Sequence, residues 1–158
     1  MFHILALCAG NASRSILAEA ILNRDGQGRV KAWSAGANPK GVITPQVRDV
    51  LERRGAGHDA MRSKSWNEFA AQGAPDLDLV LNLCPTVSGA TQPDWPGQPI
   101  SVHWHLDDPS AAPPGQVDLA CQQAYHGLSI RVNAFLSLPF ERLSRSVLTA
   151  RLADIGES

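Results

Sequence analysis

The chain has 158 residues, a length that fits one domain with one substantial core. Its formal net charge is −1, with 44% hydrophobic and 18% charged residues. Such a charge provides no broad basic field for nucleic acid, so any anion has to be attracted locally. Three cysteines are too few for a disulfide framework and indicate reduced thiols. The start of the chain does not resemble a signal peptide, and no apolar run is long enough to cross a membrane. We therefore expect a cytoplasmic protein.

The first half of the chain predicts two strands and two helices. Residues 2–7 form a short apolar run that is typical of a buried strand. After a Gly/Asn/Ser turn at 9–13, apolar side chains recur on one helical face over residues 14–24. A second strand is predicted at 30–34. Thr44 as a cap and Pro45 in the first turn then predict a helix that ends at Gly55.

The second half of the chain continues the alternation. Residues 85–99 are rich in Pro, Gly, Ser and Thr and indicate a loop. The other predicted elements are a short helix at 65–71, a strand at 77–83, a strand at 100–104, a long helix at 116–137 and a last helix from near Pro139 to before Gly156. This order predicts a single α/β domain over residues 1–158, with an open parallel four-stranded sheet between two layers of helices.

The most informative segment joins the first strand to the first helix and reads Cys8-Ala9-Gly10-Asn11-Ala12-Ser13-Arg14-Ser15. In such a turn, successive backbone N–H groups can point inward and form an anion cradle. Gly10 and Asn11 are residue types that tolerate a positive φ. A helix N-terminus and a nearby cation favour the thiolate of Cys8, to which Ser15 can donate a hydrogen bond. The Arg14 guanidinium can hold two oxygens of a tetrahedral anion.

These features together predict that Cys8 is a nucleophile acting on a phosphate-like oxyanion. The alternative is an inert, buried structural cysteine.

This segment resembles the catalytic loop of the low-molecular-weight protein tyrosine phosphatases and of the arsenate reductases that share their fold. The resemblance extends over nearly the whole chain. Segments similar to the arsenate reductase branch are Ser34-Ala35-Gly36, Pro39 with Gly41 and Pro45, Arg62-Ser63-Lys64, Cys84 at a strand end, His103-Trp104, Asp107-Asp108-Pro109 and Phe135-Leu136-Ser137-Leu138-Pro139. The resemblance implies a low-molecular-weight phosphatase-like fold.

Two residues besides the loop are candidates for chemistry. The resemblance implies that Asp108, before Pro109, is the general acid that protonates the leaving oxygen. Asp107 is the second choice, and an ordinary exposed turn is the alternative. Cys8, Cys84 and Asp108 all follow predicted strands, and ligand sites of open parallel sheets lie beyond the carboxyl ends of the strands. We therefore expect all three at one edge of the sheet.

A second thiol near Cys8 indicates redox chemistry. In an arsenate reductase, Cys8 would form a thiol–arsenate adduct, Cys84 would attack the Cys8 sulfur, and arsenite would leave behind a Cys8–Cys84 disulfide. A structural role for Cys84 is the alternative. Two other functions stay open: a phosphatase that hydrolyses a phosphocysteine intermediate of protein tyrosine or aryl phosphates, and a non-enzymatic oxyanion-binding domain. The small residues after Pro109 favour arsenate over an aromatic substrate.

The resemblance also bears on the reductant. Several relatives carry a third cysteine a few residues beyond the second, and the corresponding position is Gln92. Cys121 shares an apolar helical face with Tyr125, Leu128, Val132 and Phe135, which indicates packing. We therefore expect no tightly bound cofactor and predict that an external thiol, such as glutathione with glutaredoxin, thioredoxin or another small thiol, regenerates the enzyme.

Some relatives bind a potassium ion near the loop. Asn11, Glu19 and Ser34 match that site in kind, whereas Lys64 stands where a carboxylate is expected. We predict that the Lys64 ammonium replaces the ion, that it supports the loop through Asn11 or Glu19, and that no metal is required. A solvated surface lysine is the alternative. His103 and His105 lack further ligands at metal-binding spacing and are expected to be structural.

Overall fold

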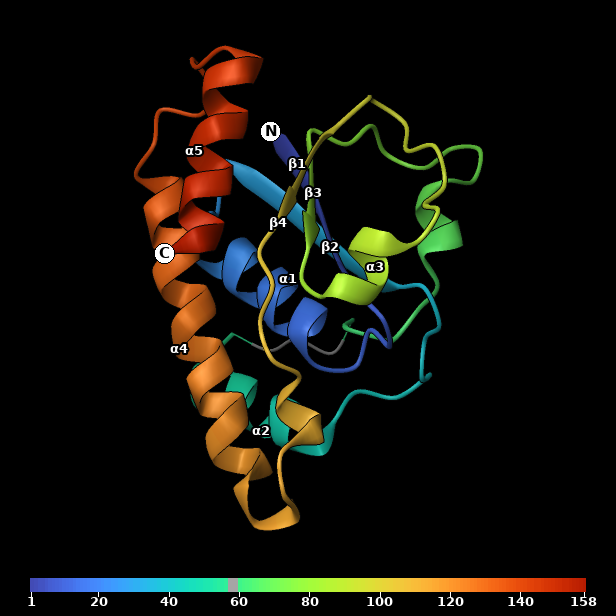
Figure 1. The fold of residues 1–158 in the computed structure, drawn as a ribbon, viewed down its shortest axis with the longest axis vertical. Coiled ribbons are helices and arrows are strands. Elements are labelled where there is room, and N and C mark those ends of the chain that lie inside the picture. The colour runs from blue at the N-terminus through green and yellow to red at the C-terminus, as the bar shows by residue number, and fades with distance from the viewer. Residues whose placement is uncertain (57–59) are drawn as a thin grey trace.

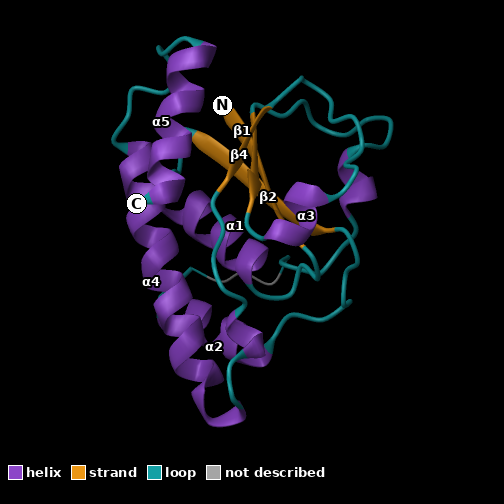
Figure 2. Ribbon diagram, in the orientation of Figure 1, coloured by secondary structure: helices purple, strands orange, loops and turns teal. Residues whose placement is uncertain are grey.

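The computed structural model describes residues 1–56 and 60–158. Its sheet contains four parallel strands in the order β2-β1-β3-β4 (Figures 1 and 2). The strands are β1 Phe2–Cys8, β2 Val30–Gly36, β3 Leu79–Asn82 and β4 Ile100–His103. The predicted α/β class and parallel four-stranded sheet are confirmed.

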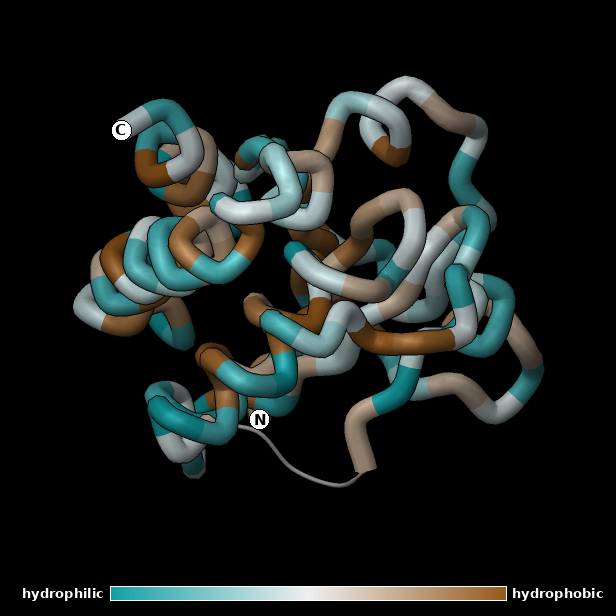
Figure 3. Tube along the Cα trace, turned by 90° about the horizontal axis from the view of Figure 1, so that it is seen from below, coloured by the Kyte–Doolittle hydropathy of each residue, from teal (hydrophilic) through white to brown (hydrophobic). Residues whose placement is uncertain are grey.

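Helices cover both faces of this sheet. They are α1 Arg14–Asp25, α2 Pro45–Arg53, α3 Pro85–Gly89, α4 Val117–Leu136 and α5 Arg145–Glu157, with 3₁₀ turns at Trp66–Phe69, Pro109–Ala111 and Pro114–Gln116. Helices α1, α4 and α5 lie on one side and α3 on the other (Figure 1). Hydrophobic and hydrophilic residues alternate along the helices, as expected where one helical face is buried (Figure 3).

The structure corrects two of the predicted elements. The segment 85–99, predicted to be a loop, contains α3. This short helix is held by tertiary contacts, since Val87 is fully buried and its carbonyl accepts a hydrogen bond from Gln92. The last helix begins at Arg145 rather than near Pro139, because Ser144 caps it, and it continues through Gly156 to Glu157.

Strand β1 is the centre of the hydrophobic core and sets the position of the site. Its residues Ile4, Leu5, Ala6 and Leu7 have no exposed surface. Cys8 ends this strand, so the core fixes the point at which the chain turns into the loop. Within the described part of the chain, no helix combines the length and hydropathy that a membrane span requires.

Candidate active site

The loop after β1 is shaped by hydrogen bonds on its outer side. The carbonyls of Ala9, Gly10 and Ala12 accept bonds of 2.9–3.0 Å from backbone N–H groups of residues 38–44. Asn11 adopts a φ of 46°, in the left-handed region. Across residues 1–56 and 60–158, no backbone N–H of residues 9–13 donates to a protein acceptor. The amide donors of residues 9–13 are therefore not used by the described residues and remain available to an anion.

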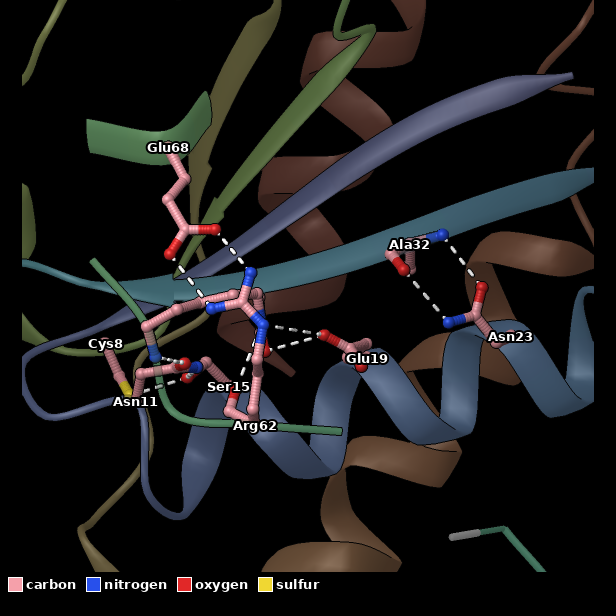
Figure 4. A network of polar contacts seen from close by, with 10 residues as sticks. Cys8, Asn11, Ser15, Glu19, Asn23, Ala32, Arg62 and Glu68 are labelled. Carbon is pink, nitrogen blue, oxygen red and sulfur yellow. Dashed lines mark hydrogen bonds and ion pairs between the residues drawn. The ribbon is translucent and has the colours of Figure 1, made fainter. Parts of the chain in front are cut away.

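Ser15 connects the loop to the thiol. Cys8 is 2% exposed, and its Sγ lies 2.8 Å from Ser15 Oγ. Asn11 Nδ2 donates to the same Ser15 oxygen at 2.8 Å, which leaves the serine proton available for the sulfur. The backbone N–H of Lys64 donates to Asn11 Oδ1 at 2.8 Å and so orients the amide (Figure 4). The arrangement can stabilise a Cys8 thiolate.

Arg14 presents an unpaired donor at the loop. One guanidinium nitrogen donates to Leu106 O at 3.3 Å, and the other lies 3.8 Å from Asp108 Oδ2. Arg14 Nε is buried and has no hydrogen-bond partner. A buried donor without a partner is costly, so an oxyanion that accepts from Nε would remove this cost.

Asp108 is placed to act beside Arg14. Its side chain is 31% exposed. Oδ1 accepts hydrogen bonds from Ser110 N at 3.0 Å and Ser110 Oγ at 2.7 Å, which leaves Oδ2 toward Arg14. Asp107 is exposed and makes no ion pair among the described residues. The geometry thus favours Asp108 over Asp107 as a proton donor.

Cys84 lies two residues beyond the end of β3, the strand that pairs with β1, and directly precedes α3. Leu7 pairs with Asn82, and Leu83 N donates to Leu7 O at 2.9 Å, so Cys84 is one residue beyond the neighbour of Cys8. Adjacent strands are about 4.8 Å apart, and a disulfide needs Cα atoms about 4.4–6.8 Å apart. Both thiols are free and each is 2% exposed.

Lys64 and Glu19 form a buried ion pair behind the loop. Lys64 Nζ lies 3.6 Å from Glu19 Oε1, to which Ser34 Oγ also donates at 2.8 Å. Burial lowers the pKa of Lys64, and the charge of Glu19 opposes that shift. Lys64 thus contacts Asn11 through its backbone and Glu19 through its ammonium. Over the described ranges, no group of three or more His, Cys, Asp or Glu side chains is arranged to hold a metal ion.

His103, the last residue of β4, and His105, two residues beyond it, both contact one serine, a contact that the sequence did not reveal. His103 Nδ1 and His105 Nε2 each lie 2.8 Å from Ser88 Oγ, on α3. Burial lowers the pKa of His105, and the charges of His103 and Arg14 add to the shift. Both rings therefore anchor the short helix that follows Cys84. Ser88 lies in a segment with no periodic signal, so nothing in the sequence pointed to this contact.

Cys121 lies on the buried face of α4. It is fully buried on one helical face with Tyr125, Leu128, Val132 and Phe135, as predicted. Burial, followed by the charges of Asp118 and Asp108, raises the pKa of this thiol to about 11. A thiol of this kind is neutral and unreactive at physiological pH.

Comparison with known families agrees with this geometry. The sequence model of the low molecular weight phosphotyrosine protein phosphatases matches residues 3–113, more than two thirds of the chain. The chain belongs to this family. The resemblance seen in the Cys8–Ser15 segment is thereby confirmed for the low molecular weight phosphatases.

Both branches of the low molecular weight phosphatase fold occur among the similar proteins. A glutaredoxin arsenate reductase from Synechocystis sp. is 28% identical over 109 residues, which cover 69% of this chain and 79% of the relative. An Archaeoglobus fulgidus arsenate reductase has a TM-score of 0.62 at 24% identity, covering 82% of this chain and 98% of its own. A protein tyrosine phosphatase from T. tengcongensis has a TM-score of 0.59 at 24% identity, covering 82% and 95%. At these identities the structural likeness establishes the fold.

Proposed function

We propose that this chain reduces arsenate to arsenite, with Cys8 as the nucleophile and Cys84 as the second thiol. The observation that carries the proposal is the free Cys84 thiol just beyond the end of β3, the strand that pairs with β1 where Cys8 ends it. A phosphatase needs only one thiol, whereas a two-electron reduction needs two. The arsenate reductase relative from Synechocystis supports the same branch.

The first step is nucleophilic attack on arsenic. The Cys8 thiolate displaces one arsenate oxygen, which leaves as water after protonation, and an S–As bond forms. Asp108 is the proposed proton donor, since it lies beside Arg14 at the mouth of the loop. The loop amides and Arg14 Nε hold the remaining oxygens, whose negative charge they compensate.

The second step transfers two electrons. The Cys84 thiolate attacks Cys8 Sγ, an S–S bond forms, and the S–As bond breaks. Its electron pair stays on arsenic, which leaves as arsenite in the lower oxidation state. The Cys8–Cys84 disulfide is then reduced by an external pair of thiols, which become a disulfide themselves. We propose glutathione with glutaredoxin, or a thioredoxin, as that reductant, because Gln92 stands where a third cysteine would act.

A phosphatase is the second candidate, and family membership favours it. Cys8 would attack phosphorus, Asp108 would protonate the leaving oxygen, and water would hydrolyse the phosphocysteine. The chain after Pro109 offers Ser110, Ala111 and Ala112 rather than aromatic rings. A small oxyanion suits this site better than a phenyl phosphate.

Substitution of Cys84 distinguishes the two proposed functions. We expect Cys84→Ser to abolish arsenite formation while leaving any hydrolysis of aryl phosphate intact, and Cys121→Ser to change neither activity. Mass spectrometry after arsenate is added without reductant should find a Cys8–Cys84 crosslink. Unchanged arsenite production by the Cys84→Ser variant, or a crosslink to Cys121, would overturn the proposed mechanism.

A further inference from the structure

The outer wall of the loop brings a lysine to the loop's exposed side. Residues 38–44 run along the loop and bond to its carbonyls, with Lys40 N donating to Gly10 O at 2.9 Å. Gly41 N donates to Ser63 Oγ at 3.1 Å, and Ser63 Oγ donates to Gly10 O at 3.2 Å. The backbone of Lys40 is therefore held by hydrogen bonds from its own N–H and from the N–H of Gly41.

The Lys40 side chain lies across Gly10. A Cβ atom added to Gly10 would lie 3.1 Å from Lys40 Cγ and 3.1 Å from its Cε, with Cδ at 3.3 Å. The whole alkyl stem thus covers the position where other residues carry a side chain. Long cationic side chains commonly pack their stems in this way and keep the charged head in water. Since Nζ is one bond beyond Cε, the ammonium lies close to Gly10.

This contact is at the least buried part of the loop. Asn11, Ala12 and Ser13 are buried, whereas Ala9 and Gly10 are only half-buried and Lys40 is exposed. The Lys40 stem thus covers the half-buried part of the loop. The side chain of Lys40 makes no hydrogen bond or ion pair with any residue of 1–56 and 60–158, so its charge is not compensated by a carboxylate there.

We propose that Lys40 is a specificity-determining residue that recruits dianionic oxyanions to the Cys8 loop. This inference rests on the proposed function for its substrate class. The net charge of the chain is −1, so attraction of arsenate or phosphate depends on local cations. Arg14 supplies one cation within the site, but Asp108 partly offsets it. Lys40 supplies a second cation at the rim, where it acts on the approaching anion and not on the reacting atoms.

The test uses charge and ionic strength on the full, reduced chain. Lys40→Met keeps a stem of similar length and removes the charge, and Lys40→Arg keeps the charge. Lys31→Met is the matched control, because the Lys31 ammonium lies over the Trp33 ring on β2, 5.8 Å from its centre. The readouts are calorimetric affinity for inorganic phosphate, and kcat and KM for arsenate, at low and at high salt.

At low ionic strength we expect Lys40→Met to weaken phosphate binding about three- to tenfold and to raise KM for arsenate by the same factor, with kcat unchanged. High salt should remove most of this difference, since exposed charges are screened. Lys40→Arg and Lys31→Met should match the wild type. The proposal is overturned if Lys40→Met binds phosphate as the wild type does, or if its loss persists at high salt.

Phosphate binding needs neither Cys84 nor arsenic, so the two proposals fail separately. If the wild type forms no arsenite, or if Cys84→Ser forms it at the wild-type rate, the proposed arsenate reduction fails. The Lys40 test then remains valid for a phosphatase. A normal Cys8–Cys84 crosslink with unchanged phosphate affinity in Lys40→Met removes only the role of Lys40.

Discussion

At the scale of single residues, the Ser15 hydroxyl is the direct support of the Cys8 sulfur. Its oxygen accepts from Asn11, and its proton is available for the sulfur 2.8 Å away. A hydrogen bond to a charged group is worth about 1.5–3 kcal/mol. We therefore expect Ser15→Ala to slow alkylation of Cys8 by iodoacetamide at neutral pH by roughly tenfold to a hundredfold, as followed by mass spectrometry.

The control for this variant is Ser65→Ala. Ser65 Oγ accepts a hydrogen bond of 3.1 Å from Asn67 N and caps the turn Trp66–Phe69, so its loss removes a serine hydroxyl without touching the thiol. Cys8 in Ser65→Ala should react at the wild-type rate. Equal rates in the two variants would show that Ser15 does not stabilise the thiolate.

The burial of the Lys64 ammonium predicts how the free energy of unfolding depends on pH. Its pKa is lowered from 10.5 in the folded chain, mainly because burial disfavours the charged form. Between that lowered pKa and 10.5, the unfolded chain binds more protons than the folded chain at this site, so stability contributed by Lys64 rises with pH. The free energy of unfolding of the wild type, minus that of Lys64→Met, should increase from neutral pH toward pH 10.5.

Urea denaturation of both proteins across this range measures that difference, and the other titrating groups largely cancel in the subtraction. The charged groups around Lys64 are Glu19, Arg62 and Glu68. A difference that falls with pH would mean that attraction by Glu19 outweighs burial of the ammonium.

Some residues of the site could be predicted from the sequence because their signal is local. The spacing of Cys8, Arg14 and Ser15 between a strand and a helix indicates an anion loop without any tertiary information. Lys64 was expected to contact Asn11 or Glu19, and it contacts both. The stem of Lys40 over Gly10 and the unpaired Arg14 Nε could not be predicted, because they depend on how distant segments pack.

At the scale of elements, α3 determines where Cys84 sits. Gln92 Nε2 donates to Asn82 Oδ1 at 2.7 Å and to Val87 O at 2.8 Å, and so ties the helix to the end of β3. We expect Gln92→Ala to loosen α3 and to raise the alkylation rate of Cys84 several-fold. The variant loses these two hydrogen bonds and the 3.1 Å bond that Trp95 Nε1 donates to Gln92 Oε1, which should also lower the free energy of unfolding by about 1.5–4.5 kcal/mol.

Alkylation of Cys8 in the same protein is an internal reference, because the hydrogen bonds of Gln92 to described residues go to Asn82, Val87 and Trp95 and not to the loop. Gln122→Ala is the matched variant, since Gln122 is on α4 and bonds Asp118 at 3.3 Å. Cys84 reactivity that stays at the wild-type level in Gln92→Ala would mean that α3 is held by Val87 and Ser88 alone.

The helices at 14–24 and 116–137 were predicted closely, whereas α3 was missed and the start of α5 was misplaced. The helix predicted over residues 14–24 corresponds to α1 at Arg14–Asp25, and the helix predicted over 116–137 corresponds to α4 at Val117–Leu136. In α4 the buried side chains recur on one face from Cys121 to Phe135, whereas in α1 every residue from Ser15 to Leu22 is buried. The five residues of α3 are too few to show a period, and their Pro, Gly and Ser content favours a loop. Its helix is stabilised by side chains from elsewhere in the chain.

At the scale of the whole molecule, the C-terminal helix supports the strand that leads to Asp108. Leu148 and Leu152 of α5 are buried, and Trp104 Nε1 donates to Leu152 O at 2.9 Å. Trp104 follows directly on β4 and precedes the segment that carries Asp108. Helix α5 thus holds the end of β4, the strand that leads to Asp108 beside Arg14. Helix α5 and Asp108 are far apart in the sequence.

Gly156 is the point of closest approach between α5 and β4. A Cβ atom at Gly156 would collide with the His103 carbonyl oxygen and lie 2.7 Å from Trp104 Cδ1. Gly156→Ala should therefore displace α5 and lower the free energy of unfolding by about 1–3 kcal/mol, the usual effect of overpacking. Gly127→Ala is the matched change on α4, where an added Cβ meets nothing within 4 Å. That variant should be more stable than the wild type by up to about 1 kcal/mol, since alanine is the better helix former. Urea denaturation of the three proteins measures both shifts, and a stabilised Gly156→Ala variant would show that α5 does not press on the end of β4.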